Sequence, residues 1–359
     1  MDRKDLQNII GTLCCILLLG ACTKDKPGKP DTTVPTDSSR KVLVSCEGSL
    51  GNGNASLSIY FPVKDSVYQD VYTAANGKPL GDIFQSITRI GSRYFFCINN
   101  SDVIVVLNPD NWLQVGTIAV SKPRYILPLD NNKAYVSTLF SNKLYVINTA
   151  TLAVEKQLTL PYKNTEGMLR AGNAAWCCSW DTGSNCIYKM NTVTDAIDDS
   201  IVLTGRAPQS IVTDKEGKAW VMGGNVVQGK TTTLHRIDLA TKTILKAYSF
   251  GKDVEAIKPA FNPAKDTLYF IEVNYSGGPV NNGIFRMRTD DAALPATPFI
   301  TCGIYQYFWA LATDPVTGNI YVGDPKGFVQ NGSVLIYRPD GSLQGKFTTG
   351  LGPGSFYFN

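Results

Sequence analysis

"RYILPLDNNKAYVSTLFSNKLYVINTATLAVEKQLTL", residues 124–160, contains four short strand patterns in a row. The aromatic segment 133–138 is preceded by the apolar segment 124–130 and followed by another at 143–148 and a more polar one at 153–160. Short runs rich in Tyr, Val, Ile and Thr are typical of β-strands, and the Asn- and Ser-containing links between them are typical of turns. The stretch therefore predicts one four-stranded antiparallel sheet.

The aromatic segment recurs seven times. The copies begin at residues 41, 93, 133, 174, 218, 267 and 319, at spacings of 52, 40, 41, 44, 49 and 52 residues. We call this the first strand of each repeat. A second strand follows it, as in "SLSIYF" at 56–61, and then a polar third strand is found in six repeats, among them "VYQDVYT" at 67–73. The polarity of the third strand predicts an outer edge that is partly in water.

A fourth strand precedes six of the first strands, and its seventh copy is "GSFYFN" at 354–359, the C-terminus of the chain. Seven complete sheets therefore form only if residues 356–359 of this last segment pair with residues 42–46. Periods of 40 to 50 residues with four strands each are typical of propeller blades. Two β-sandwiches would not require the same strand order seven times. The sequence predicts an all-β, seven-bladed propeller over residues 41–359, closed by its C-terminal strand, with no helix of useful length after residue 40.

The first 40 residues differ from the repeats. Arg3 and Lys4 precede an apolar run at 9–20, which is too short for a spanning helix and fits a signal peptide at 1–21. The ending Leu19-Gly20-Ala21-Cys22 resembles a bacterial lipobox, which implies lipidation at Cys22. The Pro- and Lys-containing segment 22–40 is then a flexible tether. An ordinary secretory signal cut near Ala21 is the alternative.

Composition narrows the function. A net charge of +4 without a basic block gives no reason to expect nucleic acid as a partner. Besides Cys14 and Cys15 in the predicted signal and Cys22, six cysteines remain, and none has the CxxC spacing of a zinc ribbon. Cys178 and Cys186 flank a hairpin loop and could pair, although buried free thiols are the preferred interpretation.

Catalytic patterns are sparse. His235, the single histidine, lies in a predicted strand at 234–239, so a surface or strand-face position is expected rather than a role as a base. Glu47, Glu166, Glu255 and Asp324 could converge on a central metal, but each can also accept backbone amides in a turn, which we prefer. We therefore predict no metal, no cofactor and no enzyme activity.

Ligands of propellers bind over the central channel, on loops that join first to second strands and third strands to the next fourth strand. These loops contain amide, aromatic and basic side chains that suit a large, polar, neutral ligand. The candidate ligand-binding residues are Asn52, Asn54, Asn99, Asn100, Arg124, Tyr125, Trp180, Gln209, Tyr305, Tyr307, Trp309 and Phe328. Packing at blade junctions is the alternative role for the aromatic ones.

Several motifs in order resemble one family. They are "GNGNASLSIY" (51–60), "NGKPLGDIFQSIT" (76–88), "INNS" (98–101), "KPRYI" (122–126), "KAYVSTL" (133–139), "TEGM" (165–168), "DTLYFI" (266–271) and "GLGPGSFYF" (350–358). Together they are similar to the YncE-like, DUF5074-type propeller lipoproteins of Bacteroidota, whose BtuG branch captures cobalamin at the cell surface above a TonB-dependent transporter.

The resemblance implies a lipid-anchored protein of the outer membrane, facing the cell surface, that binds a corrinoid and passes it to a TonB-dependent barrel. Segments 223–230 and 323–330 depart from the BtuG pattern, so a different transporter substrate is one alternative. A scaffold that binds a protein on its flat face is another. A lactonase or lyase propeller is disfavoured because the chain has a single histidine.

Overall fold

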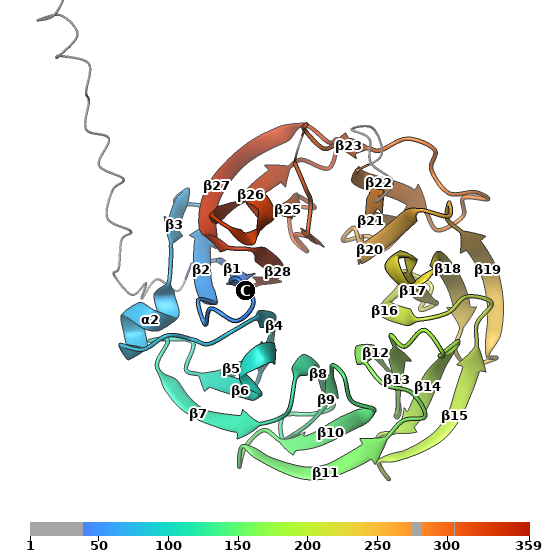
Figure 1. Ribbon diagram of the computed structural model, residues 1–359, viewed down its shortest axis with the longest axis horizontal. Coiled ribbons are helices and arrows are strands. Elements are labelled where there is room, and N and C mark those ends of the chain that lie inside the picture. The colour runs from blue at the N-terminus through green and yellow to red at the C-terminus, as the bar shows by residue number, and fades with distance from the viewer. Residues whose placement is uncertain (1–38, 275–281, 305) are drawn as a thin grey trace, which may run out of the picture. The chain divides into compact units, whose positions relative to one another are not determined.

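The fold is described for residues 39–274, 282–304 and 306–359 by a computed structural model. These residues form seven four-stranded sheets, and neighbouring strands in each sheet are antiparallel. Figure 1 shows the sheets arranged as blades around a common centre, with the fourth strand of each repeat innermost. The predicted seven-bladed, all-β propeller is confirmed.

The strands follow the repeat order. The inner (fourth) strands are β4 (Phe84–Ile90), β8 (Pro123–Pro128), β12 (Thr165–Ala171), β16 (Pro208–Thr213), β20 (Val254–Phe261), β24 (Ala310–Thr313) and β28 (Pro353–Phe358). The first strands are β1 (Val42–Cys46), β5 (Arg93–Ile98), β9 (Lys133–Thr138), β13 (Ala174–Ser179), β17 (Ala219–Asn225), β21 (Thr267–Asn274) and β25 (Ile320–Asp324).

The second strands are β2 (Ser56–Phe61), β6 (Val103–Leu107), β10 (Lys143–Asn148), β14 (Cys186–Asn191), β18 (Lys230–Asp238), β22 (Gly283–Arg288) and β26 (Asn331–Tyr337). The third, outer strands are β3 (Ser66–Tyr68), β7 (Gln114–Ala119), β11 (Ala153–Thr159), β15 (Ala196–Val202), β19 (Thr243–Ser249), β23 (Ile300–Thr301) and β27 (Leu343–Leu351). The 3-10 turns η1 (Asn99–Ser101), η2 (Val226–Gln228) and η3 (Lys326–Phe328) follow first strands.

Ring closure occurs in the blade that joins both ends of the propeller. β28 pairs antiparallel with β1, with Val42 opposite Phe358 and Val44 opposite Phe356. The Asn359 amide donates to the Lys41 carbonyl at 3.0 Å. The inner strands of neighbouring blades contact one another around the whole ring, including β28 with β4 and β24 with β28. The predicted closure by the chain end is confirmed.

Two third strands depart from the repeat. In the first blade the strand predicted at 67–73 is wrong beyond Tyr68, because the chain turns into the short helix α2 (Val71–Asn76). Its side chains Val71 and Tyr72 are buried, and Asn76 fixes its end by donating to the Trp112 carbonyl at 3.0 Å and accepting from the Gln114 amide at 2.8 Å. β23 lies in the one repeat for which we predict no third strand from the sequence, and it has only two residues.

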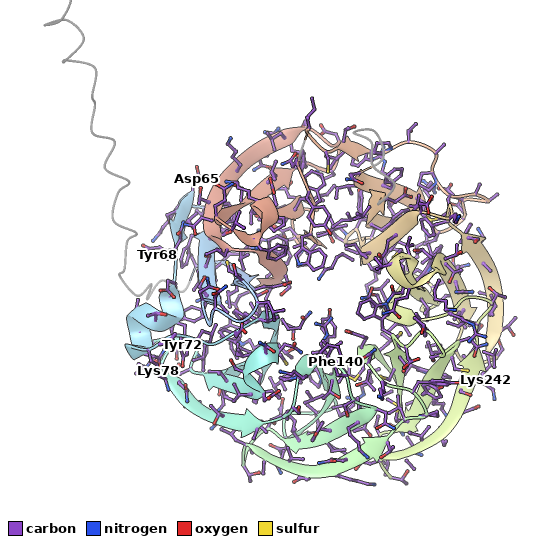
Figure 2. The ribbon with its side chains drawn as sticks, in the orientation of Figure 1. Asp65, Tyr68, Tyr72, Lys78, Phe140 and Lys242 are labelled. Carbon is purple, nitrogen blue, oxygen red and sulfur yellow. The ribbon has the colours of Figure 1, made fainter. Side chains whose placement is uncertain are left out.

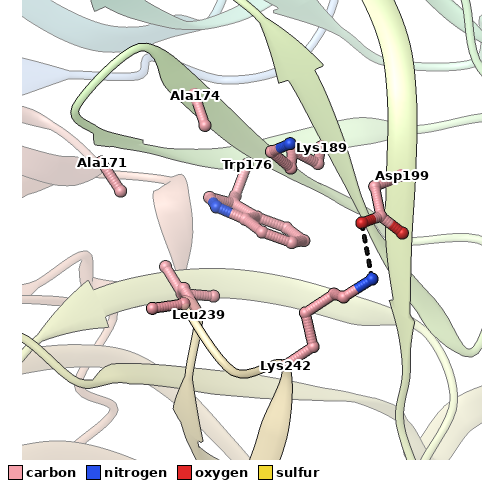
Figure 3. Close-up of a pocket in the computed structure, with 8 residues that line it drawn as sticks. Ala171, Ala174, Trp176, Lys189, Asp199, Leu239 and Lys242 are labelled. Atoms are coloured by element: carbon pink, nitrogen blue, oxygen red, sulfur yellow. Dashed lines mark hydrogen bonds and ion pairs between the residues drawn. The ribbon is translucent and has the colours of Figure 1, made fainter.

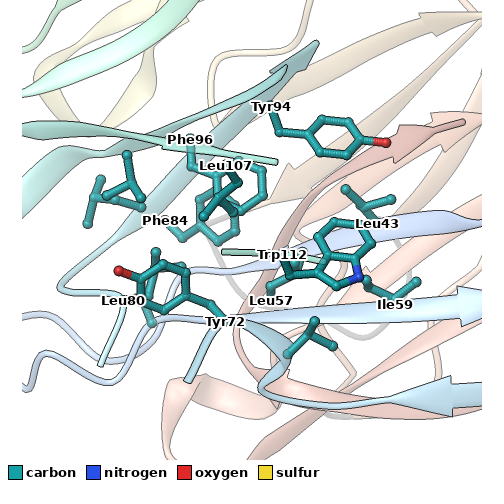
Figure 4. Close-up of a cluster of buried hydrophobic side chains, with 14 of the residues drawn as sticks. Leu43, Leu57, Ile59, Tyr72, Leu80, Phe84, Tyr94, Phe96, Leu107 and Trp112 are labelled. Atoms are coloured by element: carbon teal, nitrogen blue, oxygen red, sulfur yellow. The ribbon is translucent and has the colours of Figure 1, made fainter. Parts of the chain in front are cut away.

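Buried side chains between adjacent blades hold the ring together. Figure 4 shows the cluster between the first two blades, where Leu43, Tyr94 and Trp112 are fully buried. The Tyr94 and Trp112 rings stack with centroids 5.7 Å apart. Burying large aromatic side chains between sheets stabilises the fold by about 2 kcal/mol each. Cys178 is a buried free thiol, as the preferred interpretation has it, whereas Cys186 is a free thiol that is only half-buried.

The features predicted for the start of the chain lie mostly outside the described residues. These are the signal peptide at 1–21, the lipidation site Cys22 and nearly all of the tether. Arg40, at the end of the predicted tether, pairs with buried Asp314 in the turn between β24 and β25. Within the described part of the chain no helix has the length and apolarity needed to span a bilayer.

Candidate functional site

The two faces of the ring are built from different connections. Because neighbouring strands are antiparallel, the loops from first to second strands and from third strands to the next inner strand lie together. We call this side the channel face. The opposite side, which we call the turn face, carries the turns from inner to first and from second to third strands. The predicted ligand-binding residues therefore lie in loops of the channel face or at the ends of the inner strands that adjoin this face.

Irregular pairing marks the channel-face ends of several inner strands. The register with the first strand shifts at Gln85 in β4, at Arg124 and Tyr125 in β8, at Glu166 in β12 and at Gln209 in β16. A β-bulge bends a strand and redirects its side chains, and bulges are frequent beside functional sites. In Figure 2, side chains from the inner strands reach into the centre of the ring.

Arg124 joins three neighbouring blades. Its Nε donates to Glu166 Oε1 at 2.9 Å, and its Nη1 donates to the side-chain oxygen of Gln85. The Gln85 amide in turn donates to the Tyr125 hydroxyl at 3.2 Å. The structure thus brings the predicted residues Arg124 and Tyr125 together with Glu166 and with Gln85.

Glu166 is the acid of this group, and it is deeply buried. Its side chain has no exposed surface, and its Oε2 has no hydrogen-bond partner among the described residues. Burial raises the pKa of the Glu166 carboxyl above its ordinary value, while the charge and the hydrogen bond of Arg124 act in the opposite direction. The preferred interpretation that Glu166 caps a backbone turn is therefore wrong, because its hydrogen-bonding partner is a guanidinium.

A second cluster, the Trp309 cluster, consists of Tyr307, Trp309, Phe328 and Glu47. The Trp309 ring stacks on Tyr307 with centroids 6.0 Å apart and meets the Phe328 ring edge-on at 5.8 Å. Its indole Nε1 donates to Glu47 Oε1 at 2.8 Å. The three rings are only half-buried. Three residues predicted from loop position are therefore neighbours that present aromatic surface.

Two glycines allow this close packing. A Cβ on Gly354 would lie 2.3 Å from Glu47 Oε1, and a Cβ on Gly352 would lie 2.5 Å from the Phe328 ring. Gly352, whose φ is +62°, is also the whole connection between β27 and β28. The final inner strand thus approaches the cluster by backbone alone.

Lys258 reaches the Trp309 cluster from another blade. It lies in the irregular part of β20, and its Nζ is 5.6 Å from the Trp309 ring centroid and 3.3 Å from the Gly354 carbonyl oxygen. Its charge also acts to lower the pKa of Glu166. Since β20 and β28 are separated by β24 in the ring, the Lys258 side chain must extend along the channel wall.

The other predicted residues that the structure describes do not join these clusters. Asn54 accepts from the Ser49 amide at 2.8 Å and so orders its own loop, while Asn52 is exposed in the same loop. Asn100 donates to Asp82 at 2.5 Å and accepts from Lys122 at 2.8 Å.

Four predicted positions remain. The Trp180 indole donates to the Gly224 carbonyl at 2.9 Å, which links two blades. Gln209 is half-buried at the start of β16. Asn99 is buried and donates to the Pro123 carbonyl at 3.1 Å, whereas Tyr305 lies outside the described residues.

The remaining candidates for chemistry are separate from one another. Asp324 accepts from the Lys326 amide at 3.0 Å, as a turn acid does, and Glu255 is buried at the start of β20. Over the described ranges, no group of three or more His, Cys, Asp or Glu residues is placed to hold a metal ion. His235 is buried on a strand face, 2.7 Å from the Thr204 hydroxyl, and burial lowers its pKa to about 4.

Exposed apolar side chains surround the polar centre of the channel face. They come from loops of several blades and have exposed fractions from 37% to 81%: Leu50, Phe140, Tyr162, Val227, Ile304 and Val329. Figure 2 labels Phe140 near the inner margin of the ring. Solvent-exposed apolar groups gathered on one face are typical of interaction surfaces.

A pocket also lies away from the channel, between the fourth and fifth blades. It has a volume of about 320 Å³ and is lined by Trp176, Leu239 and two lysines among others. Figure 3 shows Lys242 paired with Asp199, at 2.7 Å. Lys189 pairs with Asp198 at 3.2 Å. Because both lysines already have carboxylate partners, the channel face remains the stronger candidate.

Sequence reasoning missed Gln85 and Lys258 as parts of the site. Gln85 could have been found by aligning the fourth strands, because it lies at the same bulged position as Arg124, Glu166 and Gln209. Lys258 gave no comparable signal, since the irregularity of β20 falls between Ile257 and Ala260, several residues after the strand begins.

Comparison with known structures supports the fold. A quinoprotein alcohol dehydrogenase-like protein from Bacteroides thetaiotaomicron is 13% identical with a TM-score of 0.68, covering 89% of this chain and 78% of its own. Hydrazine synthase from Kuenenia stuttgartiensis is 15% identical, with a TM-score of 0.58 and coverages of 75% and 87%. A streptogramin B lyase is 14% identical, with a TM-score of 0.53 and coverages of 77% and 89%. At these identities the likeness shows the propeller fold alone.

Family membership rests on the sequence of the propeller. No curated protein matches the chain. Residues 42–341, which contain five complete blades and three of the four strands of each of the other two, match the family described as a domain of unknown function, DUF5074. The protein is therefore a member of the DUF5074 family.

Proposed function

We propose that this protein is a surface-anchored binding protein that captures cobalamin or a related corrinoid over the channel face. It would then pass the ligand to a TonB-dependent transporter in the outer membrane. The observation that carries the proposal is the Trp309 cluster, which offers half-buried aromatic surface beside hydrogen-bonding groups. Binding sites for large organic ligands combine such apolar walls with a few polar groups that fix orientation.

The polar groups near the channel supply that second component. Gln85, Arg124 and Tyr125 form a chain of amide, guanidinium and hydroxyl groups across two inner strands. A corrin ring carries amide side chains around its edge, and such groups can both donate to and accept from this chain. Asn52 and Asn54 lie in the loop after β1, exposed at the rim, and Gln209 lies on the opposite wall.

The exposed apolar loops support the second half of the proposal, delivery to a barrel. A protein that rests on a transporter needs a surface that can be covered, and the apolar side chains of the channel face provide one. The tether fits the same arrangement. Its last residue, Arg40, is held on the turn face by Asp314, so a lipid at Cys22 would connect to the side opposite the ligand.

Equilibrium titration with cyanocobalamin tests the ligand. We expect binding at micromolar concentration or tighter, and we expect Trp309→Ala to weaken it about 30-fold, since removing a central aromatic contact costs about 2 kcal/mol. Phe347→Ala is the matched control, because this half-buried ring stacks on Tyr60 in the outer part of the ring, with centroids 4.4 Å apart. Absence of binding at micromolar ligand would overturn the corrinoid proposal.

A protein-binding scaffold is the second candidate, favoured by the same exposed apolar loops. Co-purification from the native membrane separates the two functions. A transporter recovered with the protein, equally with and without added corrinoid, together with no bound corrinoid in mass spectra, would favour the scaffold. Ligand-dependent recovery would favour capture and delivery.

A further inference from the structure

Lys258 is a cation at the channel wall that has no carboxylate within ion-pair distance among the described residues. The ion pairs among the described residues include Arg124 with Glu166 but none with Lys258. Its Nζ donates to one backbone carbonyl, that of Gly354. An ammonium group has three donors, so two remain for other acceptors.

The backbone at Lys258 is held in an unfavourable conformation. Its φ is +55°, in the left-handed region, and it lies where the pairing of β20 with β21 shifts register. A residue other than glycine adopts this region only at an energetic cost. The conformation places the side chain along the channel wall rather than in the sheet, because its Nζ lies near Trp309 and Gly354 of the next two blades.

The neighbouring acids each accept a hydrogen bond from another residue, although Glu166 Oε2 has no partner among the described residues. Glu166 accepts the Arg124 guanidinium, and Glu47 accepts the Trp309 indole N–H at 2.8 Å. Lys258 lies over the face of that same indole ring, at 5.6 Å from its centroid. The positive group with open donors therefore stands directly beside the aromatic surface that the proposed ligand would cover.

We infer that Lys258 binds an oxyanion, the phosphodiester group of the ligand, while the Trp309 cluster contacts its apolar body. This inference rests on the proposed function and defines it further. A complete cobalamin carries a phosphodiester in its nucleotide loop, whereas cobinamide lacks that loop and its phosphate. Lys258 thus makes the site selective for corrinoids that retain the nucleotide.

Titration of three proteins with two probes tests this assignment. The wild type should bind cyanocobalamin more tightly than dicyanocobinamide. Lys258→Met should weaken cyanocobalamin binding about 10- to 100-fold, the value of a hydrogen bond to a charged group, and leave dicyanocobinamide binding within about twofold. Lys258→Arg keeps the charge and should restore most of the selectivity.

The control and the salt dependence complete the test. Lys265→Met removes the same charge from an exposed residue of the turn between β20 and β21 on the turn face, and should change neither affinity. Added NaCl should weaken cyanocobalamin binding to the wild type more than to Lys258→Met, because salt screens the ion contact.

The outcomes separate the two proposals. If the wild type binds both probes and Lys258→Met weakens both equally or neither, the assignment of Lys258 is overturned and corrinoid capture stands. If the wild type binds neither probe, the proposed function fails and the assignment fails with it. Circular dichroism melting of each variant distinguishes a lost contact from a protein that has not folded.

Discussion

The turn face and the channel face of this propeller are held in different ways. On the turn face, an Asn or Asp at the start of a turn accepts the amides of the second and third residues that follow it. Asn148 accepts from Ala150 and Thr151, both at 3.0 Å, and Asp238 accepts from Ala240 and Thr241 at 3.0 and 3.3 Å. In each such turn, these backbone amides find their hydrogen-bond acceptor within a segment of five residues.

The channel face is held by contacts between distant segments. The Ser49 hydroxyl donates to the Phe328 carbonyl at 2.5 Å, and the Thr138 amide donates to the Thr165 hydroxyl of the next blade at 2.7 Å. Most of the exposed large aromatic and aliphatic side chains of the loops gather there. The comparison indicates that the turn face serves the fold, whereas the channel face combines support with surface available for binding.

The largest expected effect is on stability, from a change in the turn face. Asp214 is buried in the turn after β16 and accepts from the Trp220 indole at 3.0 Å and from Arg236 Nε at 2.8 Å. Asp214→Ala leaves these donors without their acceptor and should lower the free energy of unfolding by about 3–5 kcal/mol. Urea denaturation measures this loss.

A second turn acid provides the control for Asp214. Asp238 has the same turn role but is more exposed, so Asp238→Ala should cost only about 1 kcal/mol. Ligand affinity should not change in either variant under conditions where the protein is folded. Equal losses of stability in both, or a loss of affinity in either, would contradict the division between the faces.

An intermediate effect concerns pH, because buried His235 is hydrogen-bonded to Thr204 in a channel-face loop. Burial lowers its pKa from 6.5 to about 4, so the unfolded state binds the proton more strongly between these values. Stability therefore falls as the pH drops from about 6.5 to about 4, by about 3 kcal/mol from this group.

His235→Gln removes the titration while keeping a side chain that can hydrogen-bond to Thr204. Urea midpoints at pH 7.5 and 4.5 should differ less in this variant than in the wild type. The quantity compared is the change in urea midpoint between the two pH values. Groups other than His235 contribute equally to this change in the wild type and in the variant, so their contributions cancel. A variant as acid-sensitive as the wild type would show that another group dominates.

The smallest effect on stability is expected at the exposed apolar residues of the channel face. Phe140 and Val329 have exposed fractions of 70% and 81%. Phe140→Ser and Val329→Ser should change the free energy of unfolding by less than about 0.5 kcal/mol. Both should nevertheless reduce recovery of the transporter in co-purification.

A matched substitution on the turn face sharpens this last comparison. Val316, in the turn between β24 and β25, is 74% exposed, so Val316→Ser makes the same chemical change on the other side of the ring. It should leave transporter recovery unchanged. An equal decrease with Val316→Ser would show that the channel face is not the docking surface.

Most of the fold could be predicted from the sequence because its elements repeat. The aromatic first strands and the Asn- and Asp-led turns are local patterns, and seven copies reinforce one another. The exceptions are the third strands of the first and sixth blades. In the first blade α2 replaces most of the third strand, since Val71 and Tyr72 are buried in the core of two blades rather than alternating in a sheet. In the sixth blade the third strand is reduced to the two residues of β23.

The candidate site could be predicted only in part. Loop position identified Trp309, Tyr307 and Phe328, which the structure brings together, and Arg124 with Tyr125. It also selected Asn54 and Asn100, whose amides are engaged in local hydrogen bonds. Residue type and position do not tell whether an amide in a loop orders that loop or faces a ligand.

The sequence by itself determined the number of blades, the strand order and the closure of the ring by residues 354–359. Each of these follows from short-range periodicity and from a count of the repeats. Tertiary structure alone decided that Lys258 meets Trp309, that Arg124 bridges Gln85 and Glu166, and that Arg40 lies beside Asp314. These contacts join residues 39 to 274 positions apart, and only the curvature of the closed ring brings their inner strands and turns within reach.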